Sequence, residues 1–282
     1  MSALNGLQDG AELSPLRRFG FNIAAAFRLL LLRPARGGTM RPRDGRRAAL
    51  LAGAALAAFF LCMVLLDAAS IRAVGRLPPG VPWFFDQITD YGKSGWFLWP
   101  LGVLLVVLAV LPRSRLTHVS QRVLAAVTVR VGFLFLAIGV PGLFINIVKK
   151  ICGRARPLVP GNIDPFAFDP FNWSAAYASL PSGHATTVFS VLVAFGSLWP
   201  RARAVIWIYA LVIVASRVAV TAHFPSDMLA GAVIGSVGAL MVRRYFALRR
   251  LAFTIGPDGA VKTLAGPSPR RLKAVARGLF AP

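Results

Sequence analysis

The sequence predicts an all-α membrane protein with six transmembrane helices, and three observations lead to this fold class. Of its 282 residues, 56% are hydrophobic, and the mean hydropathy of +0.65 is too high for a soluble domain. The apolar residues gather into long runs, the first of which, at 48–66, holds 19 residues without a charge. The 32 Lys and Arg residues lie mostly outside these runs. This distribution is typical of a polytopic membrane protein.

Six apolar runs are interpreted as membrane-spanning helices. They cover residues 48–66, 94–112, 123–148, 185–200, 204–222 and 228–242. A helix needs about 20 residues to cross a bilayer, so the last three runs are short. They also contain more small or polar residues, and we expect them to be buried in a bundle around a site. Gly231 and Gly235 form a small-xxx-small pair, which predicts that two helices approach closely there.

Basic segments flank this predicted membrane domain of residues 48–245. Residues 1–47 are interpreted as a basic cytoplasmic leader, and residues 246–282 as a basic cytoplasmic tail. Within the leader, residues 16–33 mix aromatic and leucine side chains with arginines, which predicts an amphipathic helix in the membrane interface. A secretory signal is the alternative, but Arg28 interrupts this segment and no small-residue cleavage site follows it.

The distribution of cations predicts the orientation of the spans. With the N-terminus in the cytoplasm, 23 of the 32 Lys and Arg residues fall on the cytoplasmic side and eight on the outer side, and Arg130 lies within a span. This asymmetry favours cytoplasmic positions for both termini. The net charge of +22 would suggest a nucleic-acid partner for a soluble protein. Here the membrane orientation explains the charge, so we expect no nucleic-acid partner.

Three short polar clusters stand at the edges of apolar runs between residues 149 and 227. They read K-x6-RP from Lys149, P-S-G-H from Pro181, and S-R-x5-H-x3-D from Ser216. Each cluster alone is a weak signal, because flanking cations, helix-start turns and structural histidines are common. All three fall on the outer side of the predicted topology. Together they bring cations, two of the three histidines and one carboxylate to the same face of the membrane.

In this order and spacing the clusters resemble the type 2 phosphatidic acid phosphatase (PAP2) superfamily, whose phosphate site is shared with vanadium haloperoxidases. The chain matches every specified position of the family pattern over 79 residues. The resemblance implies a PAP2-like bundle that hydrolyses a lipid phosphate at the periplasmic face of a bacterial inner membrane, with no cofactor. Family substrates include undecaprenyl pyrophosphate, phosphatidylglycerol phosphate, phosphatidic acid and lipid A phosphates. The expected activity is that of a lipid A 1-phosphatase, an undecaprenyl-pyrophosphate phosphatase or a phosphatidylglycerophosphatase B-type enzyme, with a preference for the first two.

Five residues are predicted to bind the substrate phosphate: Lys149, Arg156, Ser182, Gly183 and Arg217. The two arginines present planar forks that match phosphate oxygens, whereas Lys149 adds a point charge. Ser182 and Gly183 stand where a helix begins, so their backbone N–H groups and the helix dipole are expected to face the anion.

The resemblance assigns the catalytic roles to His223, Asp227 and His184. His223 is expected to attack phosphorus and form a phosphohistidine. Asp227 follows four residues later, a helical spacing that would hold the other imidazole nitrogen in the required tautomer. His184 is expected to protonate the leaving alcohol and afterwards to activate water.

Other site chemistries compete for the same residue types. A Ser-His-Asp hydrolase would leave Lys149, Arg156 and Arg217 without a role. Two histidines and an aspartate are plausible metal ligands, but the three cations would repel a metal ion, so no metal is expected. A phosphotransferase remains an alternative, because a phosphohistidine can pass its group to an alcohol. A non-enzymatic lipid-binding or transport protein is disfavoured because no catalytic position is lost.

Two outer connections, at 67–93 and 157–180, are rich in aromatic residues and prolines. An aromatic belt at the headgroup level is the first interpretation, because such belts are common at membrane interfaces. A lid that admits lipid tails or shields the site is the second, and the two are compatible. Cys62 and Cys152 lie in or beside apolar runs and are predicted to be free thiols.

Overall fold

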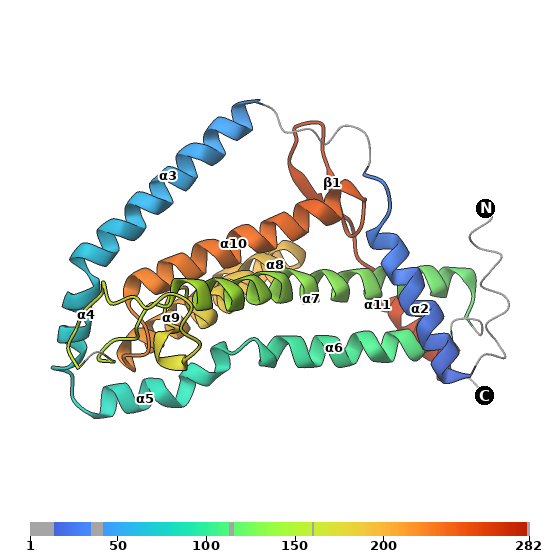
Figure 1. Cartoon of the computed structure of the whole chain (residues 1–282). Coiled ribbons are helices and arrows are strands. Elements are labelled where there is room, and N and C mark those ends of the chain that lie inside the picture. Colours follow the sequence, from blue (N-terminus) through green and yellow to red (C-terminus); the bar gives the residue numbers. More distant parts are fainter. Residues whose placement is uncertain (1–13, 35–41, 113–115, 160, 281–282) are drawn as a thin grey trace. The chain divides into compact units, whose positions relative to one another are not determined.

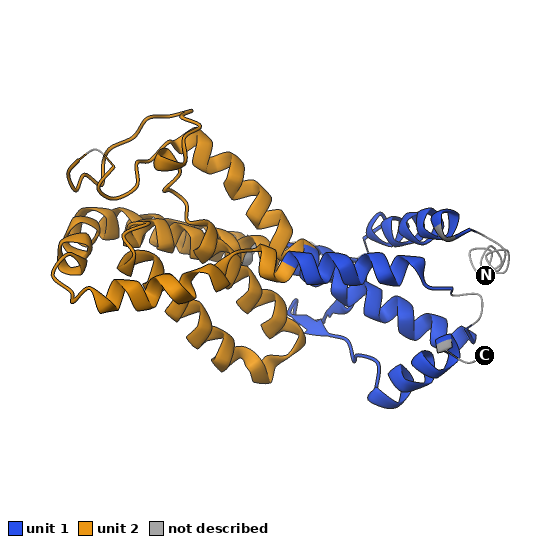
Figure 2. Ribbon diagram, turned by 90° about the horizontal axis from the view of Figure 1, so that it is seen from below, with its two compact units in different colours: residues 1–38, 98–135, 242–282 blue, residues 39–97, 136–241 orange. Residues whose placement is uncertain are grey.

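The structure is a computed structural model that describes residues 14–34, 42–112, 116–159 and 161–280. The chain forms two compact units (Figure 2), one made of residues 1–38, 98–135 and 242–282 and the other of residues 39–97 and 136–241. Helices α6 (Gly95–Val110), α7 (His118–Cys152) and α10 (Pro225–Leu248) contribute residues to both units. We call the unit of residues 39–97 and 136–241 the site unit and the other the terminal unit.

The site unit is helical and contains all three polar clusters. Its remaining elements, in chain order (Figure 1), are α3 (Pro42–Leu65), α4 (Asp67–Val74), α5 (Gly80–Thr89), the 3₁₀ turns η2 (Asp90–Gly92) and η4 (Ala175–Tyr177), α8 (Gly183–Leu198), η5 (Pro200–Ala202) and α9 (Arg203–Ala219). The pairing of α8 with α9 is built on Val188, Ala210 and Ile213, which are buried in one apolar cluster. Ten of the 16 residues of α8 are buried, so this helix lies inside the bundle.

The terminal unit joins both ends of the chain to α6 and α7. It holds α2 (Pro15–Leu30), an antiparallel hairpin of β1 (Phe253–Ile255) and β2 (Val261–Thr263), and α11 (Pro269–Phe280). Val275 of α11 packs into an apolar cluster with Leu108 and Leu124. Phe133 meets Phe253 edge to face at a ring distance of 4.7 Å. The segment predicted as a basic tail is therefore folded, and its hairpin is a small addition to the all-α fold.

The predicted membrane fold is confirmed. Five helical segments of the described residues are long and apolar enough to cross a membrane: Gly45–Leu65, Gly80–Val110, His118–Cys152, Pro200–Ala219 and Pro225–Leu248. The run predicted at 185–200 forms α8, an apolar helix of 16 residues. At 1.5 Å per residue, α8 is about 24 Å long, shorter than the roughly 30 Å hydrocarbon core. Each of the six predicted runs thus coincides with an apolar helix.

One expected boundary was wrong. The third run was predicted to end at residue 148, but α7 continues to Cys152 and places Lys149 in its last turn. The outer connection 67–93, interpreted as an aromatic belt or a lid, forms α4, α5 and η2, and α5 packs along α9. Side-chain packing against α9 explains this ordering, because it buries Thr89 at the end of α5.

The close helix approach predicted from Gly231 and Gly235 is confirmed. A Cβ on Gly231 would lie 2.5 Å from the backbone oxygen of Ser182, and one on Gly235 would lie 2.3 Å from the backbone oxygen of Thr186. Both distances are shorter than van der Waals contact, so α10 meets α8 backbone to backbone at these glycines. Ser190 adds a hydrogen bond from its hydroxyl to the Gly235 carbonyl, at 3.1 Å.

We predict that Gly235→Ala destabilises the protein by about 1–3 kcal/mol, because the new methyl group must push two helix backbones apart. This cost exceeds the roughly 0.5–1 kcal/mol that alanine gains over glycine within a helix. Thermal unfolding in detergent measures the change. Gly142→Ala on α7 is the matched control, because no atom of the described residues lies within 4 Å of its added Cβ. Equal melting temperatures for the two variants would contradict the prediction.

Candidate active site

The start of α8 is fixed by Ser182, which is fully buried. Its hydroxyl caps the helix by accepting from the Ala185 N–H at 3.5 Å. Its own backbone N–H donates to the Asp227 carbonyl at 3.1 Å. This corrects one expectation, since the Ser182 N–H is committed to Asp227 and does not face an anion. The N–H groups of the first helical turn, which begins at Gly183, have no partner within the helix.

Lys149 lies beside this helix start. A Cβ on Gly183 would be 3.7 Å from the Lys149 ammonium nitrogen, so the last turn of α7 and the first turn of α8 meet there. After α7 the chain turns at Gly153, whose φ is +59°. A Cβ at this glycine would overlap the backbone of Asp169. Only glycine fits this turn, which aims the following residues back toward the site.

Arg156 is held by the backbone on both sides of it. The Arg156 N–H donates to the Ala176 carbonyl at 2.8 Å, and the Ala155 N–H donates to the Ala167 carbonyl at 2.9 Å. The side-chain Nε is buried and has no hydrogen-bond partner in the described part of the chain. Burial lowers the pKa of the Arg156 guanidinium, and the negative charge of Asp227 opposes that shift.

Arg217 stands in the last turn of α9 and is only 8% exposed. Its Nη1 donates to the Thr89 hydroxyl at 2.8 Å, and the Ser216 hydroxyl donates to the same oxygen at 2.9 Å. Thr89, at the end of α5, therefore orients the guanidinium. The Nε of Arg217 is buried without a partner among the residues that the structure describes.

His223 lies between α9 and α10 and is 2% exposed. Its Nδ1 lies 3.6 Å from Oδ2 of Asp227, within ion-pair distance, and 3.5 Å from the Ser179 hydroxyl oxygen. The same Oδ2 accepts from the Ser179 hydroxyl at 2.6 Å and from the Phe224 N–H at 2.9 Å. Burial lowers the pKa of His223, and the Asp227 carboxylate opposes this. A lowered pKa favours the neutral imidazole, which is the form that can attack phosphorus.

His184 occupies the first turn of α8, and its Nε2 is buried without a partner in the described residues. Gly92 of η2 packs against its ring, because a Cβ there would lie 2.8 Å from His184 Cδ2. Electrostatic interactions link His184 with His223 and Arg217, and Arg217 with Arg156. The fold therefore brings the three sequence clusters into one site.

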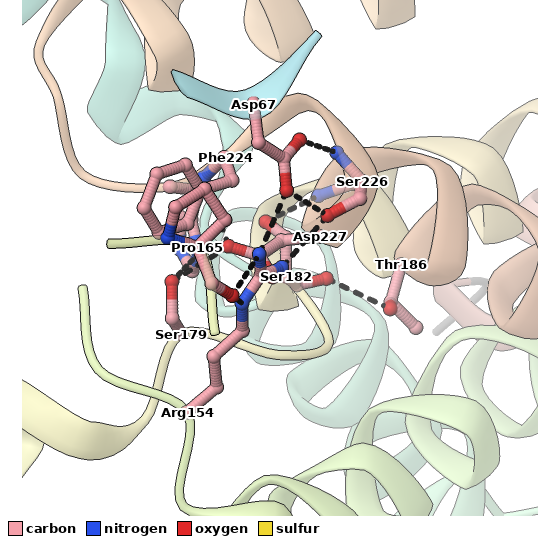
Figure 3. Close-up of polar contacts among 11 residues, drawn as sticks. Asp67, Arg154, Pro165, Ser179, Ser182, Thr186, Phe224, Ser226 and Asp227 are labelled. Atoms are coloured by element: carbon pink, nitrogen blue, oxygen red, sulfur yellow. Dashed lines mark hydrogen bonds and ion pairs between the residues drawn. The ribbon is translucent and has the colours of Figure 1, made fainter. Parts of the chain in front are cut away.

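Asp227 belongs to a buried ion cluster (Figure 3). Arg154 is fully buried and forms ion pairs with Asp67, at 2.7 Å, and with Asp227, at 2.6 Å. Asp67 also accepts from the backbone N–H of Ser226 at 2.9 Å. The cluster joins the start of α4, the segment after α7 and the start of α10.

Sequence reasoning missed Asp67, Thr89, Gly92, Arg154 and Ser179 at this site. Two of them left a visible signal: Asp67 ends the first apolar run, and Arg154 stands between two residues of the first cluster. Nothing in the spacing pairs them, because they are 87 residues apart. Thr89, Gly92 and Ser179 are of types common in any loop or helix end. Only tertiary contacts identify them: the packing of α5 and η2 for Thr89 and Gly92, and the hydrogen bond to Asp227 for Ser179.

Comparisons of the sequence with known proteins give a family and two relatives. The sequence pattern of the PAP2 superfamily matches residues 130–251. The lipid A 1-phosphatase of Rhizobium johnstonii is 33% identical over 205 residues, which are 72% of this chain and 83% of that protein. The lipid A 1-phosphatase of Rhizobium etli is 34% identical over 200 residues, which are 71% of this chain and 85% of that protein.

Two solved structures also resemble the chain. The crystal structure of Aquifex aeolicus LpxE covers 63% of this chain and 94% of its own, with 22% identity and a TM-score of 0.45. The PAP2 type phosphatidylglycerolphosphate phosphatase from Bacillus subtilis covers 67% and 92%, with 18% identity and a TM-score of 0.45.

The assignment rests on the sequence relatives. The matched region contains all three polar clusters, and the chain spans more than four fifths of each Rhizobium protein at more than 30% identity. This chain belongs to the PAP2 superfamily.

Proposed function

We propose that this protein is a membrane lipid phosphatase that hydrolyses a lipid phosphomonoester through a phosphohistidine on His223. The two Rhizobium relatives, both lipid A 1-phosphatases, favour a 1-phosphate of a lipid A-type glycolipid as the substrate. Of the two substrates favoured by the sequence, we therefore propose lipid A 1-phosphate first and undecaprenyl pyrophosphate second.

One observation carries the proposal: three buried nitrogens in the site have no hydrogen-bond partner among the described residues. They are Nε of Arg156, Nε of Arg217 and Nε2 of His184. A buried donor without a partner is costly, and such groups commonly mark functional sites. With the Lys149 ammonium beside Gly183, these groups suit a compact dianion such as a phosphomonoester.

The reaction has two steps in this proposal. Nε2 of His223 attacks phosphorus while Asp227 supports Nδ1–H. The bond from phosphorus to the lipid oxygen breaks, and that oxygen takes a proton from His184. Water then attacks the phosphohistidine, giving its proton to His184 as the N–P bond breaks. Lys149, Arg156 and Arg217 stabilise the charge on the equatorial oxygens in both transition states.

The purified protein, incubated with a panel of lipid phosphates, tests the proposal. Lipid A 1-phosphate is expected to release inorganic phosphate fastest, ahead of undecaprenyl pyrophosphate, phosphatidylglycerol phosphate and phosphatidic acid. Orthovanadate, which adopts the five-coordinate shape of the transition state, should inhibit. Chelator should leave the rate unchanged, because cations and not a metal are proposed to bind the phosphate. No phosphate release from any lipid of the panel would refute the function.

We further propose that the site faces the periplasm of a bacterial inner membrane, with both termini in the cytoplasm. The 23-to-8 distribution of cations supports this orientation. A reporter that is active only outside the cytoplasm is expected to be silent when fused after Val242 and active when fused near Asp169. The opposite pattern would overturn the orientation.

Charge-preserving substitutions test whether the guanidinium groups of Arg156 and Arg217 bind the phosphate oxygens. We predict that Arg156→Lys and Arg217→Lys each lower kcat/KM roughly a hundredfold, because losing one charged hydrogen bond in the transition state costs about 3 kcal/mol. Lys149→Arg should be milder, since Lys149 contributes a point charge. Arg201→Lys, at an exposed position of η5, is the matched control. Near-normal rates in both site variants would show that the forks do not bind the phosphate.

Alanine substitutions of His223 and His184 should impair different steps of the reaction. His223→Ala is predicted to abolish turnover and to leave no phosphoenzyme in a rapid-quench experiment with labelled substrate. His184→Ala should slow hydrolysis of alkyl phosphates most, because an alkoxide needs a proton to leave. It should slow an aryl phosphate such as p-nitrophenyl phosphate less, because that group departs unaided. An acid-labile phosphoenzyme formed by His223→Ala but not by His184→Ala would reverse the two roles.

A further inference from the structure

Arg154 is the one cation near the site whose hydrogen-bonding capacity is used entirely within the described protein. We propose that Arg154, balanced by Asp67, is a positioning residue that holds the Asp227 carboxylate toward His223. The inference rests on the proposed function for its kinetic consequences, but the geometry behind it is independent of the substrate.

The five N–H groups of the guanidinium match five contacts. Nη1 donates to Asp227 Oδ1 at 2.6 Å and to the Ser226 hydroxyl at 2.7 Å. Nη2 donates to Asp67 Oδ2 at 2.7 Å and to the Pro165 carbonyl at 2.7 Å, and Nε donates to the same carbonyl at 3.0 Å. Figure 3 shows these contacts converging on one side chain. Arg154 therefore has no donor left for a substrate, unlike Arg156 and Arg217.

This arrangement divides the two oxygens of Asp227. Oδ1 is held by Arg154, whereas Oδ2 accepts from Ser179 and the Phe224 N–H and faces Nδ1 of His223. Turning the carboxylate out of its present plane would break the contact with Arg154. The guanidinium thereby holds the carboxylate plane with one oxygen toward the imidazole, and so favours the tautomer with the proton on Nδ1.

The second carboxylate of the cluster, Asp67, determines its net charge. Arg154 alone would neutralise Asp227 and weaken its attraction for a cationic imidazole. Asp67 shares the guanidinium, and Asp67 and Arg154 are both fully buried. With both carboxylates ionised, the cluster of two carboxylates and one guanidinium carries one net negative charge; burial raises the pKa of Asp67, and its hydrogen bonds with Ser226 and Arg154 oppose that shift. That charge can stabilise the His223 ring when it becomes cationic on phosphorylation.

Cationic groups face His223 from other elements and compete with this charge. Arg156, from the segment after α7, and Arg217, from α9, both disfavour a second positive charge on the imidazole. His184 of α8 lies within electrostatic range as well. Among the charged groups of the described residues that interact most strongly with His223, Asp227 is the one that favours its cationic form. The orientation of this one carboxylate, and hence Arg154, decides how well the nucleophile is supported.

The test combines kinetics with ¹⁵N-histidine NMR of the full-length protein in detergent, which is practical because the chain has three histidines. Arg154→Lys keeps the charge but has only three donors, too few for the observed contacts. It is expected to slow phosphoenzyme formation 10- to 100-fold with KM changed less than about twofold. Its His223 spectrum should show a mixture of tautomers in place of one with Nδ1 protonated.

Asp67→Asn is the second variant, of nearly unchanged volume. It removes one negative charge, so Arg154 neutralises Asp227 more completely. His223 should then titrate at lower pH than in the unmodified protein, and turnover should fall about tenfold. Arg130→Lys is the matched control, because Arg130 also binds backbone carbonyls, those of Leu264 and Ala265, but lies in the terminal unit.

The outcomes separate the two proposals. A purely structural role for the cluster predicts lower melting temperatures but unchanged His223 tautomer, titration and rate per folded molecule, and that result in either variant would overturn the inference. Failure of the unmodified protein to release phosphate would count against the proposed function instead. The NMR comparison would still decide the positioning role, because it needs no substrate.

Discussion

The backbone hydrogen bond from Ser182 to Asp227 ties the start of α8 to the start of α10, and the arrangement of the site depends on it. It forms only because Gly231 and Gly235 let the two helices touch backbone to backbone. A bulkier residue at either glycine would separate the helix starts. The P-S-G-H turn and the His-Asp pair would then move apart, although neither would have changed in sequence.

Three arginines of the site unit, Arg154, Arg156 and Arg217, differ in whether all their N–H donors have a hydrogen-bond partner. Arg154 uses every donor within the described protein, and its charge is shared between two buried carboxylates. Arg156 and Arg217 each keep a buried Nε without a partner. A buried ion cluster adds little net stability, whereas breaking it is costly. Such a cluster suits a scaffold that must hold geometry, and the unsatisfied arginines suit the binding of an anion.

The segment between α3 and α6 lies outside the three sequence clusters but contacts the site residues. Thr89, at the end of α5, binds both Arg217 and Ser216, and Gly92 of η2 packs on the His184 ring. Asp67, at the start of α4, closes the ion cluster from the same segment. The outer connection that looked like a belt or lid in the sequence therefore supplies groups that orient the proposed catalytic residues.

The sequence by itself determined the membrane class, the positions of six apolar helices and the candidate residues. Apolar runs, flanking cations and the spacing of three clusters are local properties, so they survive without coordinates. Three features became visible only in the tertiary structure. The Ser182 N–H donates to the Asp227 carbonyl, α7 extends to Cys152, and Asp67 forms an ion pair with Arg154. The Ser182–Asp227 and Asp67–Arg154 contacts join segments 45 and 87 residues apart, and no local pattern specifies such a pairing.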